Sequence, residues 1–201
     1  QEPEAIRATV GGSRERATEI AAVLRSSAVR RIFLIGNGTS FHSAIASATL
    51  YRRHARADEP TLIAMTAGEF RNYPADLSRK DAVIGISASG EFRDVIAVAE
   101  DLRDRLTVVA VVHVPDSSLT RLAEHVLMSA GGPSPGPVMS KTFASTLTAT
   151  ALLVGEIVAI GPLAAGAQHA GVGEALTEGR PLLGVGQPVD QPHVALQRLG
   201  G

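Results

Sequence analysis

Two short hydroxyl-rich segments, Ile35–Ser40 and Ile86–Glu91, carry the residue types that bind a phosphate group. Each follows an apolar run that predicts a buried parallel strand, 31–35 and 82–86, and each precedes a helical pattern. Small residues let the backbone approach a ligand, while the free N–H groups of a helix N-terminus and nearby hydroxyls donate hydrogen bonds to an anion. Because the carboxyl ends of neighbouring parallel strands share one edge of a sheet, the two segments predict a single anion site.

The expected site takes groups from both segments. They are Gly38, Thr39 and Ser40 from the first segment and Ser87, Ala88, Ser89 and Gly90 from the second. The hydroxyls could instead be N-caps, since serine and threonine are favoured at helix starts whether or not a ligand binds. A helix needs only one cap, however, and the second segment offers a surplus of donors, which favours the anion site.

Two kinds of nucleotide site are excluded by the residues themselves. A dinucleotide-binding turn needs a third glycine where this chain has Phe41, whose ring would prevent the close approach of helix and strand. The chain also has no Gly-Lys-Thr or Gly-Lys-Ser sequence, so a nucleotide P-loop is excluded as well.

His42 and Lys141 are the candidates for chemistry at this site. His42 lies in the first turn of the helix after Ser40, where an oxygen of a bound ligand would be within reach, and histidine commonly moves protons. Lys141 opens a long apolar helix and could touch a substrate or a partner subunit. Plain structural roles stay open for both side chains, and Glu91 is expected to serve its own helix N-terminus. The general base is therefore unknown.

The composition limits the classes of partner. The chain has 201 residues, of which 45% are hydrophobic, and this favours one domain with an appendage. Nineteen basic against twenty acidic residues give a net charge of -1, which argues against nucleic acid and anionic membranes as partners. The absence of cysteine suits a cytoplasmic protein, and the histidines lack metal-ligand spacing, so we expect no metal and no cofactor.

Strands and helices, which must position these residues, alternate along the chain. A helical entry segment (1–30, its helix over 4–27) is expected to break or kink at Gly11–Gly12. Strands are predicted at 31–35, 61–65, 82–86, 107–113 and 125–129, and helices at 40–54, 67–72, 91–104, 117–124 and 141–160. Continuously apolar strands are typical of a parallel sheet covered on both faces, so we predict a doubly wound, flavodoxin-like αβα sandwich with five strands.

Six short motifs follow one another along the chain: Gln1–Ala5, Gly36–His42, Glu69–Arg71, Ser87–Glu91 with Asp94, Ser117–Leu119 and Val138–Phe143. In this ordered set the chain resembles the SIS (sugar isomerase) domain family, and most closely the first SIS domain of glutamine:fructose-6-phosphate aminotransferases. The resemblance covers roughly residues 1–160 and implies an αβα sandwich whose two hydroxyl-rich segments bind a phosphorylated sugar. Residues 161–201 would be a tail, or the start of a missing or degenerate second SIS domain. Because the chain starts with Gln1, we expect it to be a fragment or a trimmed chain.

Three departures from the family pattern bear on function. Ala88 and Phe92 stand where relatives commonly have Gln and Thr, which should weaken the hold on phosphate, and Ser134 stands where relatives usually place Glu. The catalytic Glu of a second SIS domain has no counterpart in residues 161–201.

Isomerisation between an aldose and a ketose needs a base to move a proton between C1 and C2, and only the phosphate anchor is visible in this chain. The resemblance therefore implies the phosphosugar-binding part of a sugar-phosphate isomerase or aminotransferase acting on a hexose or hexosamine 6-phosphate. The alternative is a non-catalytic module that senses a sugar phosphate. Because helix 141–160 is apolar over much of its circumference, a homodimer or higher oligomer is expected.

Overall fold

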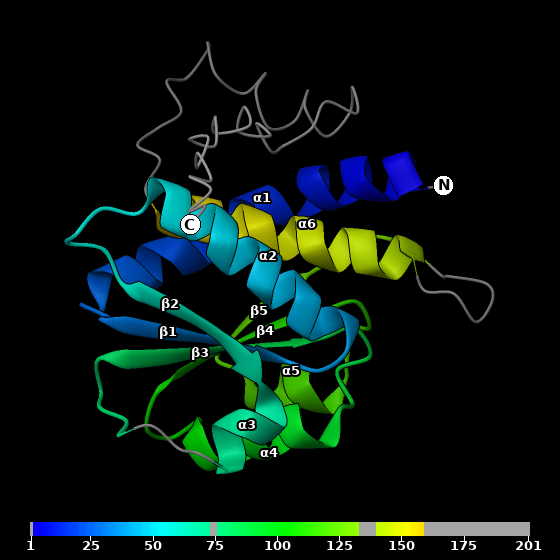
Figure 1. Cartoon of the computed structure of the whole chain (residues 1–201). Helices are drawn as coiled ribbons and strands as arrows, with labels where there is room; N and C mark the ends of the chain where they lie inside the picture. Colours follow the sequence, from blue (N-terminus) through cyan, green and yellow to red (C-terminus); the bar gives the residue numbers. More distant parts are fainter. Residues whose placement is uncertain (1, 73–75, 133–139, 159–201) are drawn as a thin grey trace, which may run out of the picture. The chain divides into compact units, whose positions relative to one another are not determined.

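The fold is a three-layer αβα sandwich built on a five-stranded sheet (Figure 1). The computed structural model describes residues 2–72, 76–132 and 140–158. In chain order the elements are α1 (Glu2–Ser26), β1 (Arg31–Gly36), α2 (Thr39–His54), β2 (Thr61–Thr66), α3 (Ala67–Asn72), β3 (Asp81–Ser87), α4 (Arg93–Leu102), β4 (Thr107–Val112), α5 (Ser118–Leu122), β5 (His125–Met128) and α6 (Ser140–Ile157).

All five strands are parallel and lie in the order β2-β1-β3-β4-β5. The chain leaves β1 towards β2 on one side and then returns to β3 on the other side, so the direction of winding reverses between β1 and β3. This is the flavodoxin order, and the predicted fold class is confirmed.

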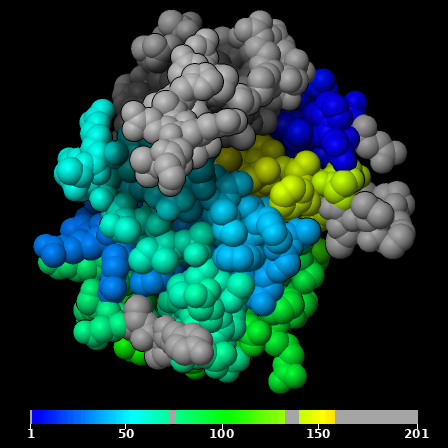
Figure 2. All heavy atoms as spheres, in the orientation of Figure 1, coloured from blue at the N-terminus to red at the C-terminus, as the bar shows by residue number. Residues whose placement is uncertain are grey.

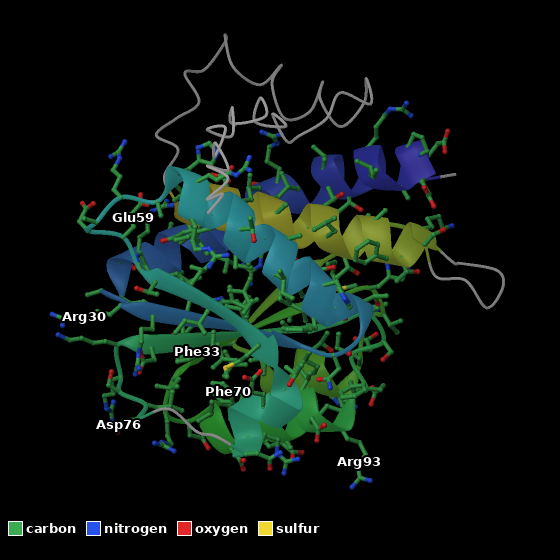
Figure 3. All side chains as sticks on the ribbon, viewed as in Figure 1. Arg30, Phe33, Glu59, Phe70, Asp76 and Arg93 are labelled. Carbon is green, nitrogen blue, oxygen red and sulfur yellow. The ribbon has the colours of Figure 1, made fainter. Side chains whose placement is uncertain are left out.

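Side chains of each strand alternate between two separate cores. Ile32 and Leu34 of β1 pack with side chains of α1, α2 and α6, while Phe33 and Ile35 pack with those of α3, α4 and α5. In the second core the rings of Phe33 and Phe70 meet edge to face with centroids 5.2 Å apart (Figure 3). A sheet covered on both faces in this way explains why the strands are apolar without alternation.

Helix α1 passes through Gly11–Gly12 without a break, so the break expected there is wrong. The residues on either side of the glycines are fixed to the end of β5 and to the segment that follows it. The amide of Ala130 donates to Thr9 Oγ1 (3.1 Å), and Ser13 Oγ donates to the carbonyl of Met128 (2.6 Å). These bonds offset the cost of about 1 kcal/mol that each glycine imposes on a helix.

Helix α6 lies between α1 and α2 (Figures 1 and 2). Its buried side chains, among them Leu153 and Ile157, join the core that also holds Ile20 and Leu24 of α1. Two helices of the same domain thus cover much of the apolar circumference of α6, from which a homodimer or higher oligomer was expected. Oligomerisation remains a prediction, but the apolar surface of α6 no longer supports it. Residues 159–160 of the predicted helix lie outside the described residues.

Candidate functional site

The two hydroxyl-rich turns follow β1 and β3, which are neighbours at the point where the winding of the sheet reverses. Gly36 makes their close approach feasible. A Cβ at this position would lie 2.9 Å from the Cβ of Ser40 and 3.0 Å from the carbonyl oxygen of Ile86. Since real side chains do not tolerate such contacts, glycine is needed where the first turn packs against the end of β3.

The first turn leads into a helix that no side chain caps. Gly38 has a positive φ of 54° and is the N-cap of α2, and no side chain accepts from the amides there. Asn37 is occupied elsewhere, because its Oδ1 accepts from the amide of Ala67 (3.3 Å) at the start of α3. Thr39 is exposed and Ser40 is 8% exposed. The amide of Ser40 donates to the carbonyl of Asn37 (3.1 Å). Because no side chain caps α2, the hydroxyls and the remaining amides of its first turn can donate to an anion.

The second turn uses its hydroxyls within the turn. Ser87 Oγ accepts from the amide of Gly90 (3.1 Å), and Ser89 Oγ accepts from the amide of Glu91 (3.2 Å). A hydroxyl that accepts one hydrogen bond still carries a proton that it can donate. Neither serine caps α4, whose N-cap is Phe92 without a side-chain bond. The capping interpretation of these hydroxyls is thus not what the structure shows, although they do bind backbone amides.

Helix α4 begins at Arg93, two residues later than predicted, because Gly90 and Glu91 are held by the start of α5. Gly90 has a φ of 69°, and a Cβ on it would overlap Ser117 Oγ. Glu91 Oε1 accepts from the amide of Ser118 (2.7 Å), and this hydrogen bond lowers the pKa of the Glu91 carboxyl. Glu91 had been expected to serve the N-terminus of α4, its own helix. It serves the N-terminus of α5 instead.

His42 is exposed on the first turn of α2, next to the first hydroxyl-rich turn. Its Nδ1 lies 2.8 Å from the carbonyl oxygen of Gly38. A carbonyl can only accept, so Nδ1 carries the hydrogen and Nε2 of the neutral ring has a free lone pair. The ring is thus oriented so that Nε2 could take a proton.

Lys141 lies in a different place. Together with Glu4, Ala8, Ala130 and Gly132 it lines a hollow of about 500 Å³, between the start of α1, the start of α6 and the segment after β5. None of the seven predicted phosphate-site residues lines this hollow. Ser134 and residues 161–201 lie outside the described residues.

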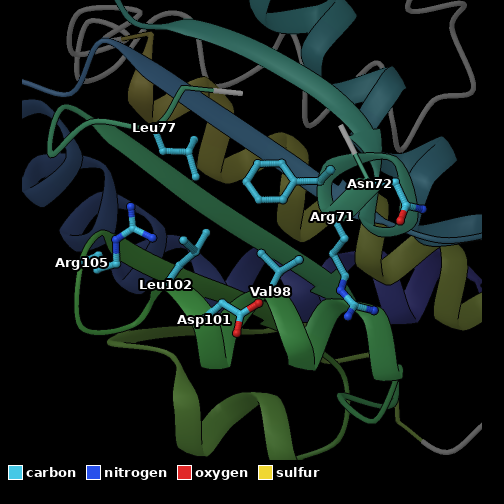
Figure 4. Close-up of a pocket in the computed structure, with 8 residues that line it drawn as sticks. Arg71, Asn72, Leu77, Val98, Asp101, Leu102 and Arg105 are labelled. Atoms are coloured by element: carbon cyan, nitrogen blue, oxygen red, sulfur yellow. The ribbon is translucent and has the colours of Figure 1, made fainter. Parts of the chain in front are cut away.

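Arg71 is a charged residue beside the second turn to which the sequence analysis gave no role. Its Nη1 is 2.9 Å from Asp94 Oδ1, and both side chains line a hollow of about 470 Å³ with Phe92, which is 43% exposed. A further hollow of about 350 Å³ lies between α3 and α4, with Arg71 and Arg105 at its two ends (Figure 4). The pairing of Arg71 with Asp94 joins residues far apart in sequence, so no local pattern could have indicated it.

A parallel sheet in the flavodoxin order, with two hydroxyl-rich turns at its switch point, defines an α/β ligand-binding domain. The family model described as the SIS domain matches residues 27–156, and the chain belongs to this family.

Curated relatives agree with this assignment. The chain is 30% identical over 159 residues to a glutamine--fructose-6-phosphate aminotransferase [isomerizing] of Pyrococcus horikoshii, and 33% identical over 154 residues to that of Methanothermobacter thermautotrophicus. These matches cover 78% and 77% of this chain but 26% and 25% of the relatives. The chain therefore spans about a quarter of the length of the aminotransferases that it matches.

Solved structures share the fold. The C-terminal domain of glucosamine-fructose-6-phosphate aminotransferase from Francisella tularensis has a TM-score of 0.67 at 22% identity, covering 78% of this chain and 45% of that one. An E. coli CFT073 protein in complex with A5P has a TM-score of 0.66 at 18% identity, covering 78% and 84%. The sugar isomerase domain of an RpiR transcription factor from Sphaerobacter thermophilus has a TM-score of 0.60 at 20% identity, covering 77% and 83%.

No helix within the described ranges is long and apolar enough to cross a membrane. Over the same ranges, no group of three or more histidine, aspartate or glutamate side chains is arranged to hold a metal ion.

Proposed function

We propose that this domain binds a sugar phosphate, with the phosphate held by Gly38–Ser40 and Ser87–Gly90. The observation that carries the proposal is the uncapped N-terminus of α2, which lies beside a turn rich in hydroxyls at the switch point of the sheet. Helix N-termini and hydroxyls are the usual donors to phosphate oxygens. The complex of one structural neighbour with A5P agrees with this ligand class.

The domain would be the phosphate-binding part of a sugar-phosphate isomerase or aminotransferase that acts on a hexose or hexosamine 6-phosphate. Its role would be to anchor the phosphate, which stabilises bound substrate and transition state alike. His42 is the candidate for moving a proton during ring opening, through its free Nε2. The base that moves the proton between C1 and C2 would come from another domain or subunit.

The alternative is a non-catalytic module that senses a sugar phosphate. It is favoured by Ala88 and Phe92, which bring no side-chain donor to the second turn, and by the fold shared with a transcription factor's sugar isomerase domain. Both functions require the same binding site and differ only in turnover. For either one we propose a cytoplasmic protein that forms a homodimer or a higher oligomer.

Calorimetry with glucose 6-phosphate tests the binding site. Replacing Ser87 and Ser89 together by alanine removes two donors to a charged group and should weaken binding at least about tenfold. Ser27→Ala is the matched control, because Ser27 is exposed after α1 and its hydroxyl binds only the carbonyl of Val23. Equal affinity of the double variant and the control would remove this site from the proposal.

A further inference from the structure

His113, directly after β4, is the residue that connects the second turn to the segment that follows β5. Its backbone amide donates to the carbonyl of Ala88 (2.9 Å), so the main chain at this position supports the second turn. The amide of Val114 approaches the same carbonyl at 3.2 Å. The end of β4 and the second turn are thus fixed to each other without help from any side chain.

The imidazole of His113 reaches in another direction. Its Nε2 lies 2.9 Å from the carbonyl oxygen of Gly132, and its Nδ1 lies 3.2 Å from Ser129 Oγ. Since the carbonyl can only accept, Nε2 carries the hydrogen, and this bond holds Gly132. Nδ1 of the neutral ring can accept from the hydroxyl of Ser129, which also lies 3.3 Å from the carbonyl of Val112 as a second acceptor.

That segment, Ala130–Gly132, is clamped from the opposite side by α1 and α6. Thr9 of α1 accepts from the amide of Ala130, and a Cβ on Gly131 would overlap Ser145 Oγ of α6. The same Cβ would lie 3.1 Å from Cε1 of the His113 ring. The segment is thus packed between the imidazole of His113 and Ser145 of α6, with no room for a side chain at Gly131.

We propose that His113 is a positioning residue that joins the phosphate turn and the hollow of about 500 Å³ beside Gly131–Gly132 into one ligand site. The inference rests on the proposed function. The phosphate would lie in the turns, and the hydroxyl groups of the sugar would face the segment that the imidazole holds. His113 would then set the affinity for the sugar part of the ligand, while the phosphate donors stay in place through main-chain bonds.

The proposal predicts different effects of a His113 substitution on the affinities for glucose 6-phosphate and for inorganic phosphate. His113→Ala should weaken the binding of glucose 6-phosphate about tenfold in calorimetry, the loss expected for one well-placed group, and should change the binding of inorganic phosphate less than about twofold. His54→Ala is the matched control, because His54 is an exposed histidine at the end of α2. A residue with a merely structural role would alter both affinities together or neither.

Two conservative variants keep the test decisive if the alanine variant folds poorly. The amide nitrogen of His113→Gln can take the place of Nε2 and donate to Gly132, whereas the shorter side chain of His113→Asn reaches only as far as Nδ1. Glutamine should therefore restore most of the glucose 6-phosphate affinity and asparagine should not. Equal affinities of these two variants, or parallel losses for both ligands, would overturn the proposal. A wild-type chain that binds neither ligand would instead defeat the proposed function, and the inference with it.

Discussion

Two constraints, a positive φ and the lack of space for a Cβ, require glycine at position 90. Its φ of 69° lies in the left-handed region, and the space where a side chain would begin is taken by Ser117. The glycine of the second turn is therefore required by the backbone and by its neighbour, and the position of Ser87 and Ser89 depends on it.

Replacing Gly90 by alanine should lower the free energy of unfolding by at least about 2 kcal/mol, through backbone strain and overlap with Ser117. The fraction of Gly90→Ala protein that remains folded should also have a lower affinity for glucose 6-phosphate. Urea denaturation measures the first effect. Gly11→Ala is the control, because a Cβ there meets nothing within 4 Å, and alanine should stabilise α1 by up to about 1 kcal/mol. A Gly90→Ala protein as stable as the wild type would contradict the account of this turn.

Asp81 at the start of β3 makes stability depend on pH. Arg31 Nε donates to its Oδ1 (2.7 Å), and this ion pair, helped by the amide and hydroxyl of Ser78, lowers the pKa of the buried carboxyl. A pKa lowered by folding means that the ionised form stabilises the fold above the unfolded value of about 4, and that this contribution is lost as the pH falls through the folded value.

Asp81→Asn should therefore be less stable than the wild type at pH 7, by about 1–3 kcal/mol. The difference should shrink as the pH falls from 5 towards about 3, because the wild-type carboxyl becomes protonated. Denaturation curves at several pH values measure it. A difference that stays constant over this range would show that the charge of Asp81 does not stabilise the fold.

At the scale of elements, α1 protects the open edge of the sheet. The strand β5 pairs on one side with β4, and the carbonyls of Val126 and Met128 accept from Arg16 Nε (3.2 Å) and Ser13 Oγ (2.6 Å) of α1. Unpaired groups on an edge strand otherwise invite pairing with another chain. The helix therefore does more than cover one face of the sheet.

Ser13→Ala should lower the free energy of unfolding by about 1–2 kcal/mol, since it leaves the half-buried carbonyl of Met128 without this donor. Ser26→Ala on the same helix should have a smaller effect, because Ser26 is exposed and its hydroxyl binds the carbonyl of Val23 three residues earlier. Urea denaturation of the two variants compares them directly. Equal losses would mean that the bond to the edge strand contributes nothing of its own.

The elements that the sequence predicted well are those whose signal is local. Apolar runs gave the five strands, and the hydroxyl-rich turns lie where strand ends were expected. The errors arose where contacts between residues far apart in the sequence determine the course of a helix or the role of a side chain. Bonds to the end of β5 and to Ala130 stabilise α1 on both sides of Gly11–Gly12, and Glu91 binds the amide of Ser118 instead of serving α4. The roles of Arg71 and His113 depend on partners at least sixteen residues away, which sequence patterns do not reveal.

For the whole molecule we predict ligand binding without turnover. The proposed site has a phosphate anchor and one oriented imidazole but no assigned base, and the chain spans about a quarter of the length of the curated relatives. The isolated 201-residue chain should therefore bind sugar phosphates and show little or no interconversion of glucose 6-phosphate and fructose 6-phosphate. A coupled assay measures turnover. Robust activity that His42→Ala abolishes would contradict this prediction and make His42 the proton shuttle.

We propose that the phosphate lies against the two turns after β1 and β3. Amide chemical shifts followed by NMR during a titration with glucose 6-phosphate test it most directly, because they report where the ligand lies. We expect the largest shifts at the amides of Gly38–Ser40 and Ser87–Gly90, and no shift of either set with unphosphorylated glucose at the same concentration. Shifts confined to the hollow between α3 and α4, around Leu102 and Arg105, would contradict it.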